Sequence, residues 1–152
     1  MKLRIVCVGK LGGAPLKAMQ EDYLERLRRF CDLEIVEVKD AAGADAASRL
    51  AREAERLREA AGAPEECVLC DEAGEEMDSR AFNRFLERRE SAAKRLTFII
   101  GSSHGVEASM KADYRKHLAL TRMTLTHEWA RVILLEQVYR AFCIRKNIPY
   151  HH

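Results

Sequence analysis

Apolar residues alternate along the chain between two spacings. Short apolar runs rich in β-branched residues predict strands, and apolar positions that recur every three or four residues predict helices. The predicted strands cover residues 2–8, 33–38, 67–70, 96–100 and 117–121. The predicted helices cover residues 16–30, 45–61, a stretch beginning near residue 78, residues 107–114 and residues 127–145. This alternation runs through residues 1–152 without a linker. It predicts one α/β domain whose mainly parallel sheet has helices on both faces.

Glycine, proline and capping residues mark where these elements end and begin. Gly62 and Pro64 follow the helix over residues 45–61, as these residue types commonly do at a helix C-terminus. Asp78 or Ser79 can cap the next helix. Ligands of such sheets bind beyond the carboxyl ends of the strands. We therefore expect a site among the loops after residues 9, 70, 100 and 121.

The helix over residues 127–145 is apolar on almost every side. One contact with a core needs only an apolar stripe, so this helix is expected to be buried against two surfaces. A partner subunit would supply the second surface and give a homodimer; a central helix in a monomer is the alternative. The polar residues of the helix must be paired or face a polar cavity. They are Arg131, Glu136, Gln137 and Arg140.

Composition excludes some classes of protein and leaves others open. The chain has 26 Lys and Arg residues against 24 Asp and Glu, so net charge alone does not indicate a nucleic-acid-binding protein. Its charged start lacks the apolar run of a signal peptide, and its apolar stretches are too short to span a bilayer. We expect a cytoplasmic protein without a membrane segment.

Two of the five cysteines form the motif Cys67-x-x-Cys70, which raises the possibility of a redox or zinc site. The motif lies in a predicted buried strand, and a spacing of three places the two thiols on opposite faces of a sheet. No second Cys or His pair lies nearby in the sequence. Structural thiols are therefore favoured, and no metal site is expected.

The segment Ile99-Ile100-Gly101-Ser102-Ser103-His104-Gly105 follows a predicted buried strand. Small residues at such a place let a ligand approach the backbone, although a plain strand-to-helix turn would read the same. The spacing matches neither a P-loop nor a dinucleotide-binding motif. The terminal run Pro149-Tyr150-His151-His152 is either a tail that docks somewhere or a disordered end.

The C-terminal third of the chain closely resembles the bacterial RlmH family of SPOUT methyltransferases. The resemblance rests on Met-Thr-Leu-Thr-His at residues 123–127, on Ala-Arg-Val-Ile-Leu-Leu-Glu-Gln-Val-Tyr-Arg-Ala-Phe at residues 130–142 and on the terminal Asn-x-Pro-Tyr-His-His. It extends over the whole chain, including the opening Lys-Leu-Arg-Ile-Val-x-Val-Gly-Lys. Members of this family methylate N3 of a pseudouridine in 23S ribosomal RNA, which the usual name of the activity places at position 1915.

The resemblance implies a parallel sheet with a C-terminal trefoil knot, a homodimer, and S-adenosyl-L-methionine bound in the knot at the subunit interface. The implied cofactor-binding residues are Cys70, Gly101, Leu120, Thr121, Arg122, Met123, Thr124 and Leu125. Two positions depart from the usual pattern of the family. Ser102 replaces a glycine, and Thr126 replaces a frequent proline but can cap the following helix.

The implied reaction needs a site that positions the methyl group and removes the N3 proton of the base, or stabilises charge on its carbonyl oxygens. The candidate catalytic residues are His127, Arg131, Tyr150, His151 and His152. Basic residues of the first predicted helix are candidate contacts to 23S rRNA in the ribosome: Lys17, Arg26, Arg28 and Arg29. A different SPOUT activity on tRNA, or an inactive ribosome-binding protein, are the alternatives.

Overall fold

The computed structural model describes residues 1–43, 45–92 and 95–151. Its strands are β1 (Lys2–Val8), β2 (Asp32–Val38), β3 (Cys67–Glu76), β4 (Leu96–Ile100) and β5 (His117–Ala119). Its α-helices are α1 (Ala14–Leu27), α2 (Ala46–Ala61), α3 (Ser79–Ala92), α4 (Ala108–Asp113) and α5 (His127–Arg145). A short 3₁₀ helix, Pro64–Glu66, precedes β3. The predicted order of strands and helices is therefore confirmed.

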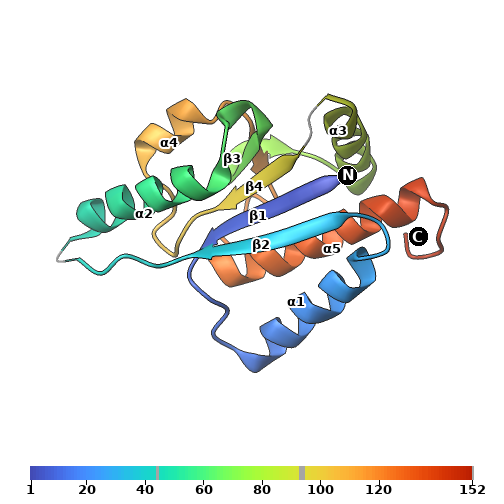
Figure 1. Cartoon of the computed structure of the whole chain (residues 1–152), viewed down its shortest axis with the longest axis horizontal. Coiled ribbons are helices and arrows are strands. Elements are labelled where there is room, and N and C mark those ends of the chain that lie inside the picture. Colours follow the sequence, from blue (N-terminus) through green and yellow to red (C-terminus); the bar gives the residue numbers. More distant parts are fainter. Residues whose placement is uncertain (44, 93–94, 152) are drawn as a thin grey trace.

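The five strands form one sheet in the order β2-β1-β4-β3-β5, and every neighbouring pair is parallel (Figure 1). One face of the sheet packs against α1, α3 and α5, and the other face packs against α2 and α4. Strand β1 shows why: Ile5 and Cys7 belong to the first core, whereas Val6 and Val8 belong to the second. Successive side chains of a central strand must fill opposite layers. The predicted fold class, α/β with helices on both faces, is confirmed.

Strand β3 is longer than predicted and turns around β5. Cys70 pairs with Leu118, a register shift follows, and Glu75 pairs with Leu118 again. At Gly74 the two backbones approach so closely that a Cβ atom would lie 2.7 Å from the carbonyl carbon of His117. The sequence pattern did not reveal this crossing because residues 71–76 are mostly acidic and carry no apolar alternation. At its other end, β5 stops at Ala119, two residues earlier than predicted.

The element boundaries follow the expected capping chemistry. Asp78 Oδ1 accepts a hydrogen bond from the Ala81 amide at 2.6 Å, and Thr126 Oγ1 accepts one from the Trp129 amide at 3.3 Å. Each satisfies a backbone N–H in the first turn of a helix, which has no partner within the helix. Gly62 has a φ of 89° after α2, a conformation that residues with a Cβ rarely adopt.

Helix α5 is buried mostly by its own chain, so its apolar character does not by itself indicate a partner subunit. It packs against the sheet and between α1 and α3, as Figure 1 shows. Leu134, Leu135, Val138 and Phe142 are all buried in this way. The central helix of a monomer therefore accounts for most of its apolar character. Trp129 is the exception on this helix, with 46% of its surface exposed.

The polar residues of α5 are paired, as their burial demands. Arg140 forms an ion pair with Glu136 one turn earlier. Gln137 donates to Glu136 and accepts from Ser79 Oγ of α3 at 2.7 Å. Arg131 donates hydrogen bonds to Gln20 of α1, to Glu37 of β2 and to the carbonyl oxygen of Gly9. These contacts fix the rotation of α5 between its neighbours.

The two cysteines of the Cys-x-x-Cys motif face opposite layers, as predicted. Cys67 belongs to the core beneath α2 and α4, and Cys70 packs against the core beneath α5. Burial raises the pKa of the Cys67 thiol to about 11 and that of the Cys70 thiol to about 12. Burial thus disfavours the thiolate form of both side chains, which fits structural thiols.

Candidate active site

A cavity of about 420 Å³ opens where β3, β4 and β5 end. This volume lies within the usual range of small-molecule sites, and the position is the one expected for a parallel α/β sheet. Five segments build its walls: residues 70–72 in β3, residues 100–106 from the end of β4, Lys111 of α4, residues within 118–125 around the end of β5, and the start of α5. The cavity therefore joins loops that are far apart in the sequence.

Seven of the eight residues that the family resemblance assigned to cofactor binding line this cavity. They are Cys70, Gly101, Leu120, Thr121, Met123, Thr124 and Leu125. Arg122 does not line it, because its side chain turns outward to Glu76 and to the carbonyl oxygen of Glu72. The cavity wall thus includes the main chain around Arg122 but not its guanidinium group.

The loop over residues 120–125 is tied down by the acidic turn after Cys70. Thr124 Oγ1 donates to Glu72 Oε2 at 3.0 Å, and Arg122 Nε lies 3.0 Å from Glu76 Oε2. Within the loop, the Met123 amide donates to Thr121 Oγ1 at 3.1 Å. These contacts hold the loop beside the cavity, while the Met123 side chain stays 76% exposed. Sequence analysis did not identify Glu72 and Glu76, because exposed acids in a loop carry no periodic signal.

Gly101 is required first by the turn that follows it. A Cβ atom there would collide with the carbonyl oxygen of Gly105 and lie 2.6 Å from Val106 Cγ1. Ser102 and Gly105 pair through two backbone hydrogen bonds, 3.1 and 2.9 Å long, that fold residues 101–105 back on themselves. The glycine lines the cavity, but its missing side chain is explained by this folded loop before any ligand is considered.

Asp71 and Lys111 add an ion pair to the cavity wall that was not predicted from the sequence, with Asp71 nearly buried and Lys111 exposed. Lys111 Nζ lies 2.7 Å from Asp71 Oδ2, and the Asp71 side chain is nearly buried. Burial opposes ionisation of Asp71, but the hydrogen bond and charge of Lys111 outweigh it and lower the pKa of the carboxyl group. Asp71 directly follows the predicted strand, so its position could have indicated a site. Lys111 is brought there only by the folding of α4.

His127 is the candidate catalytic residue that the structure places at the cavity. It is the first residue of α5 and follows the Thr126 cap. Its ring lies between the main cavity and a smaller neighbouring cavity. Nδ1 is buried and has no hydrogen-bond partner among the described residues. Nε2 lies on the side of Gly9, 3.8 Å from the point where a Cβ atom of that residue would stand.

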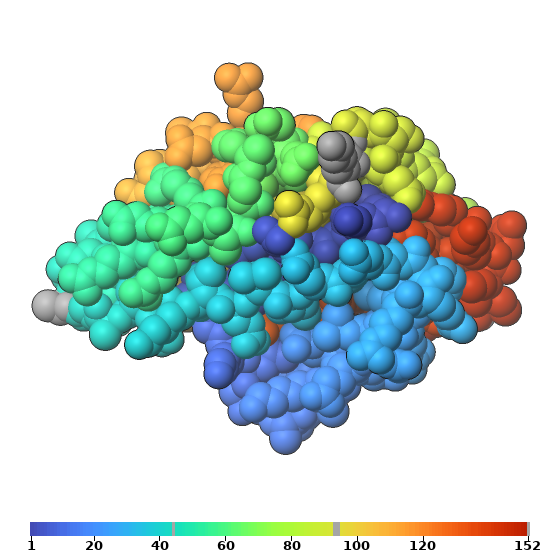
Figure 2. Space-filling view, viewed as in Figure 1, coloured from blue at the N-terminus to red at the C-terminus, as the bar shows by residue number. Residues whose placement is uncertain are grey.

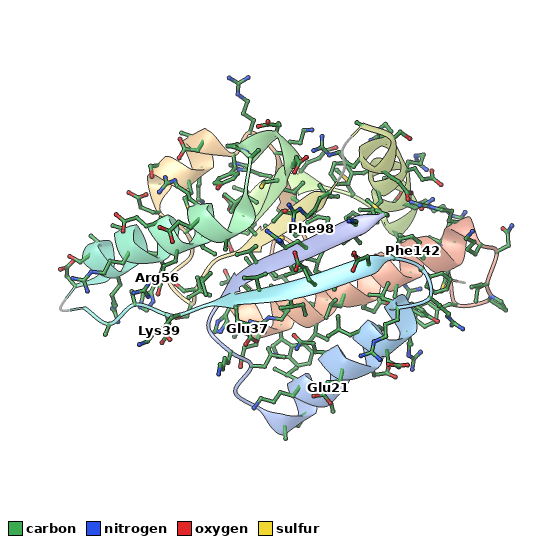
Figure 3. The ribbon with its side chains drawn as sticks, in the orientation of Figure 1. Glu21, Glu37, Lys39, Arg56, Phe98 and Phe142 are labelled. Carbon is green, nitrogen blue, oxygen red and sulfur yellow. The ribbon has the colours of Figure 1, made fainter. Side chains whose placement is uncertain are left out.

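Arg131 does not line the cavity, in contrast to its predicted catalytic placement. Its side chain is completely buried. Nη1 lies 2.6 Å from Glu37 Oε1, and Nη2 donates to the carbonyl oxygen of Gly9 at 2.9 Å. Figure 3 shows Glu37 on β2, on the side that faces α1 and α5. Arg131 joins α5 to the carboxyl ends of β1 and β2 and acts on the site only through these elements.

The C-terminal tail lies away from the cavity of its own chain. Figure 1 shows both termini near one end of the molecule, where the strands begin. Tyr150 packs edge-on against Tyr139, and its hydroxyl lies 3.2 Å from Glu136 Oε1. Glu136 is nine residues beyond His127, or about 14 Å along the helix axis. Tyr150 and His151 are therefore not brought together with His127 in one chain. His152 lies outside the described residues.

Burial and neighbouring groups also define the state of Tyr150. Burial raises the pKa of its phenol, and the hydrogen bond between Tyr150 and Tyr23 and the charge of Glu136 raise it further. Arg140 stacks over the Tyr150 ring, with its guanidinium carbon 4.7 Å from the ring centre. Tyr150 thus remains a neutral hydrogen-bonding group held by α1 and α5.

The basic residues predicted to contact RNA lie on α1 and in the turn directly after it, and α1 forms a ridge at the edge of the molecule (Figure 2). Arg26 pairs with Asp22 at 2.8 Å and Arg28 pairs with Glu25 at 2.6 Å. Arg29 lies over the Phe30 ring. These pairs reduce the positive field of α1.

The family model described as "Predicted SPOUT methyltransferase" matches residues 1–151. The chain belongs to this family of methyltransferases. It is 40% identical to the ribosomal RNA large subunit methyltransferase H of Geobacter sulfurreducens over 153 residues, which cover both chains completely. It is also 44% identical to the protein of the same name from Ruminiclostridium cellulolyticum, with 99% of each chain covered. The resemblance predicted from the C-terminal motifs is thereby confirmed.

The cavity of this SPOUT methyltransferase has walls of two kinds. Ile100, Leu118, Leu120 and Leu125 make an apolar side, and the Asp71–Lys111 pair makes a polar side. Such a cavity can hold a ligand that is apolar at one end and charged at the other. Among the described residues, no cluster of three or more His, Cys, Asp or Glu side chains is placed to hold a metal ion. Nor does any described helix have the length and apolar character of a membrane span.

Proposed function

We propose that this protein transfers a methyl group from S-adenosyl-L-methionine to N3 of a pseudouridine in 23S ribosomal RNA. In this proposal it acts on the assembled ribosome in the cytoplasm. The observation that carries the proposal is the cavity at the ends of β3, β4 and β5, where seven residues of the expected cofactor set meet. The full-length similarity to proteins named ribosomal RNA large subunit methyltransferase H supports the same assignment.

The residues of the cavity fit the cofactor. When bound, S-adenosyl-L-methionine supplies an activated methyl group, so the protein has to bind and orient this cofactor and exclude water from the site. Leu118, Leu120 and Leu125 would hold the adenine ring, and the loop over residues 101–105 would leave the main chain open to it. Ser102 stands in the wall where relatives usually have glycine and narrows this part of the cavity.

The chain must also remove the proton from N3 of the base. His127 is the proposed base, through Nε2, because its ring stands at the boundary of the cavity. Arg131 supports it from the next turn of α5, where its bonds to Glu37 and Gly9 fix the start of the helix. We assign Arg131 a positioning role and not a catalytic one.

The active unit that we propose is a knotted homodimer. Trp129, Met123 and Met19 are the large apolar side chains that stay exposed among the described residues, and Trp129 and Met123 flank the start of α5. The tail with Tyr150 and His151 cannot meet His127 of its own chain, so it would complete the cavity of the partner subunit. The knot is the fold that membership of the SPOUT methyltransferase family implies.

Helix α3 offers a better surface for RNA than α1. Arg80, Arg84 and Arg88 recur one turn apart on its exposed side. The acids of α3 face elsewhere, since Glu87 and Glu90 both pair with Arg145 of α5. Among the described residues, no ion pair involves the three arginines. An unneutralised row of guanidinium groups suits the phosphates of folded RNA.

The proposed activity is tested by transfer of a labelled methyl group from S-adenosyl-L-methionine to ribosomes that lack the modification. Digestion of the product RNA and identification of the labelled nucleoside should give N3-methylpseudouridine. Label in tRNA instead of ribosomal RNA would favour a different SPOUT activity. Failure to bind S-adenosyl-L-methionine in calorimetry would favour an inactive ribosome-binding protein.

A further inference from the structure

A second cavity, of about 230 Å³, adjoins the first at the carboxyl ends of β1 and β2. The two cavities share part of their lining: Ser102, Ser103, His104 and His127. The remaining wall comes from Val8, Gly9, Lys10, Asp40, Ala41, Arg49 and Glu53. This polar cavity lies directly beside the proposed methyl-donor site, and His127, the proposed general base, borders both cavities.

Several polar atoms around this cavity are buried without a partner. Arg49 Nε and His127 Nδ1 have no hydrogen bond among the described residues. Glu53 is only 5% exposed, and its Oε1 accepts from the Ala41 amide at 3.1 Å. No hydrogen bond of the described residues involves its Oε2. Buried polar atoms are almost always satisfied, so this grouping calls for water or a ligand that donates and accepts hydrogen bonds.

Helix α2 holds Glu53 in place through a set of contacts with the segment after β2. Arg56 Nη1 donates to the carbonyl oxygens of Lys39 and Asp40, at 2.7 and 3.2 Å. Figure 3 shows Arg56 and Lys39 side by side. Arg52 donates to the carbonyl oxygen of Ala42 at 2.8 Å. These arginines already fasten the segment to α2. The segment after β2 is therefore held without the Glu53 carboxylate, whose Oε2 has no hydrogen bond among the described residues.

The proposed substrate, pseudouridine, carries a hydrogen-bond donor that uridine lacks, and the Glu53 carboxylate could accept a hydrogen bond from it. In uridine, N1 carries the ribose and has no proton. In pseudouridine the ribose is attached to carbon, so N1 keeps its proton and becomes a donor, on the other side of the C2 carbonyl from N3. A base that places N3 in contact with the methyl donor, with His127 beside it, therefore directs N1–H to one side of the ring. A carboxylate oxygen on that side is a specific acceptor for it.

We infer that the second cavity receives the target base and that Glu53 accepts the N1–H of pseudouridine, which makes Glu53 the residue that distinguishes pseudouridine from uridine. Arg49 and Lys10, in the same wall, face the carbonyl oxygens of the base and stabilise the charge that develops there when N3 loses its proton. This inference rests on the proposed function and adds the origin of its specificity.

The test compares two ribosomal substrates that both lack the methyl group, one with pseudouridine at the target position and one with uridine. We expect the wild-type protein to prefer pseudouridine by on the order of 10³-fold in kcat/KM, because sites built to bind a donor reject analogues without it. Glu53→Gln should lower this preference to about tenfold or less, mainly through slower reaction with pseudouridine. Glu55→Gln, an exposed change on the same helix, should leave it unchanged.

Folding is checked separately by thermal unfolding and by the affinity for S-adenosyl-L-methionine, neither of which should change in Glu53→Gln. If that variant does not fold, wild-type protein can be given a substrate with N1-methylpseudouridine, which should be rejected like uridine. Equal rates on uridine and pseudouridine, or an unchanged preference in Glu53→Gln, would overturn the inference while leaving the activity intact. Absence of methyl transfer from wild-type protein to either ribosome would instead reject the proposed function.

Discussion

Arg131 of α5 and Glu37 of β2 form an ion pair in which the two partners are buried to different extents. The arginine is completely enclosed, whereas 29% of the Glu37 side chain is exposed. Nη2 of the same arginine holds the carbonyl oxygen of Gly9. The pair therefore joins the first turns of α5 to the carboxyl ends of β1 and β2, one helical turn from His127.

This asymmetry predicts unequal effects of removing either partner. Glu37→Leu leaves the buried guanidinium unpaired, so we expect the free energy of unfolding to fall by about 3–5 kcal/mol. Arg131→Met leaves a carboxylate that water can still reach, and a loss of about 2 kcal/mol is expected from the charged hydrogen bonds. Urea denaturation of both variants measures the difference. A larger loss in Arg131→Met than in Glu37→Leu would contradict this explanation.

The crossing of β3 over β5 predicts that Gly74 tolerates no side chain. A Cβ atom there would lie within 2.8 Å of three backbone atoms of His117 and Leu118, none of which can rotate away. We expect Gly74→Ala to fold poorly, with little soluble protein and a clearly lowered melting temperature. Gly13→Ala is the matched control, because the nearest atom to its Cβ is Pro15 Cδ at 3.7 Å. Equal stability of the two variants would show that β3 does not cross β5 as described.

Sequence patterns predicted the elements with a strong period and missed those shaped by contacts between distant segments. Strand β4 and helix α5 were predicted with their observed bounds, since buried apolar runs and helical spacing are local properties. The second half of β3 was missed, because its acidic residues are ordered by pairing with β5. The burial of α5 by α1 and α3 was likewise not visible from its own sequence. The sequence of an apolar helix has the same pattern whether the helix is covered by its own chain or by a partner subunit.

Substitutions at Gly101 should affect stability as well as cofactor binding. The Cβ of Gly101→Ala would meet the carbonyl of Gly105 and the side chain of Val106. We expect weaker binding of S-adenosyl-L-methionine in calorimetry together with a lowered melting temperature, and a larger effect of both kinds in Gly101→Val. Ser102→Gly restores the usual residue of relatives without this collision and should keep the melting temperature. A Gly101→Val variant that melts and binds like wild type would place the cofactor elsewhere.

The candidate site was predictable only as far as it follows strand ends. Cys70 and Gly101 end predicted strands, so the general rule for parallel sheets locates them. The loop over residues 120–125 was assigned through the family resemblance, and its place beside the other two loops depends on the fold. Arg131 was named as a catalytic candidate because a guanidinium group could stabilise the charge that develops in the implied reaction. The structure gives this guanidinium group a partner on β2 instead.

The row of arginines on α3 predicts how the protein contacts the ribosome. Changing Arg80, Arg84 and Arg88 together to Gln keeps helix propensity but removes three charges. We expect weaker ribosome binding and a slope of log affinity against log salt that is smaller by up to about 3. The triple change to Lys is the control and should retain most of the slope. If the Gln variant binds with an unchanged slope, the RNA lies on another face, and the same experiment on Lys17, Arg26 and Arg28 tests α1.

The position of the tail leads to a prediction about two chains acting together. Tyr150 is fixed to Tyr139 and Glu136, far from His127 of the same chain. Removing residues 150–152 should leave cofactor affinity nearly intact and lower methyl transfer at least about tenfold, the low end of what one positioned group contributes. His127→Gln should lower methyl transfer as well, since it removes the proposed base but keeps a side chain of similar size. Neither homodimer would then contain a complete site.

Mixing the two variants after brief denaturation separates a shared site from a site within one chain. Random pairing makes half of the dimers mixed. In a twofold dimer whose tails serve the opposite cavity, each mixed dimer has one complete site, so about a quarter of wild-type activity should return. A site built within one chain returns none, because every chain in the mixture lacks either the tail or His127. Light scattering on the same samples must give about twice the 17.3 kDa of one chain. A monomer at micromolar concentration, or full activity without the tail, would leave catalysis to His127 and the cavity of a single chain.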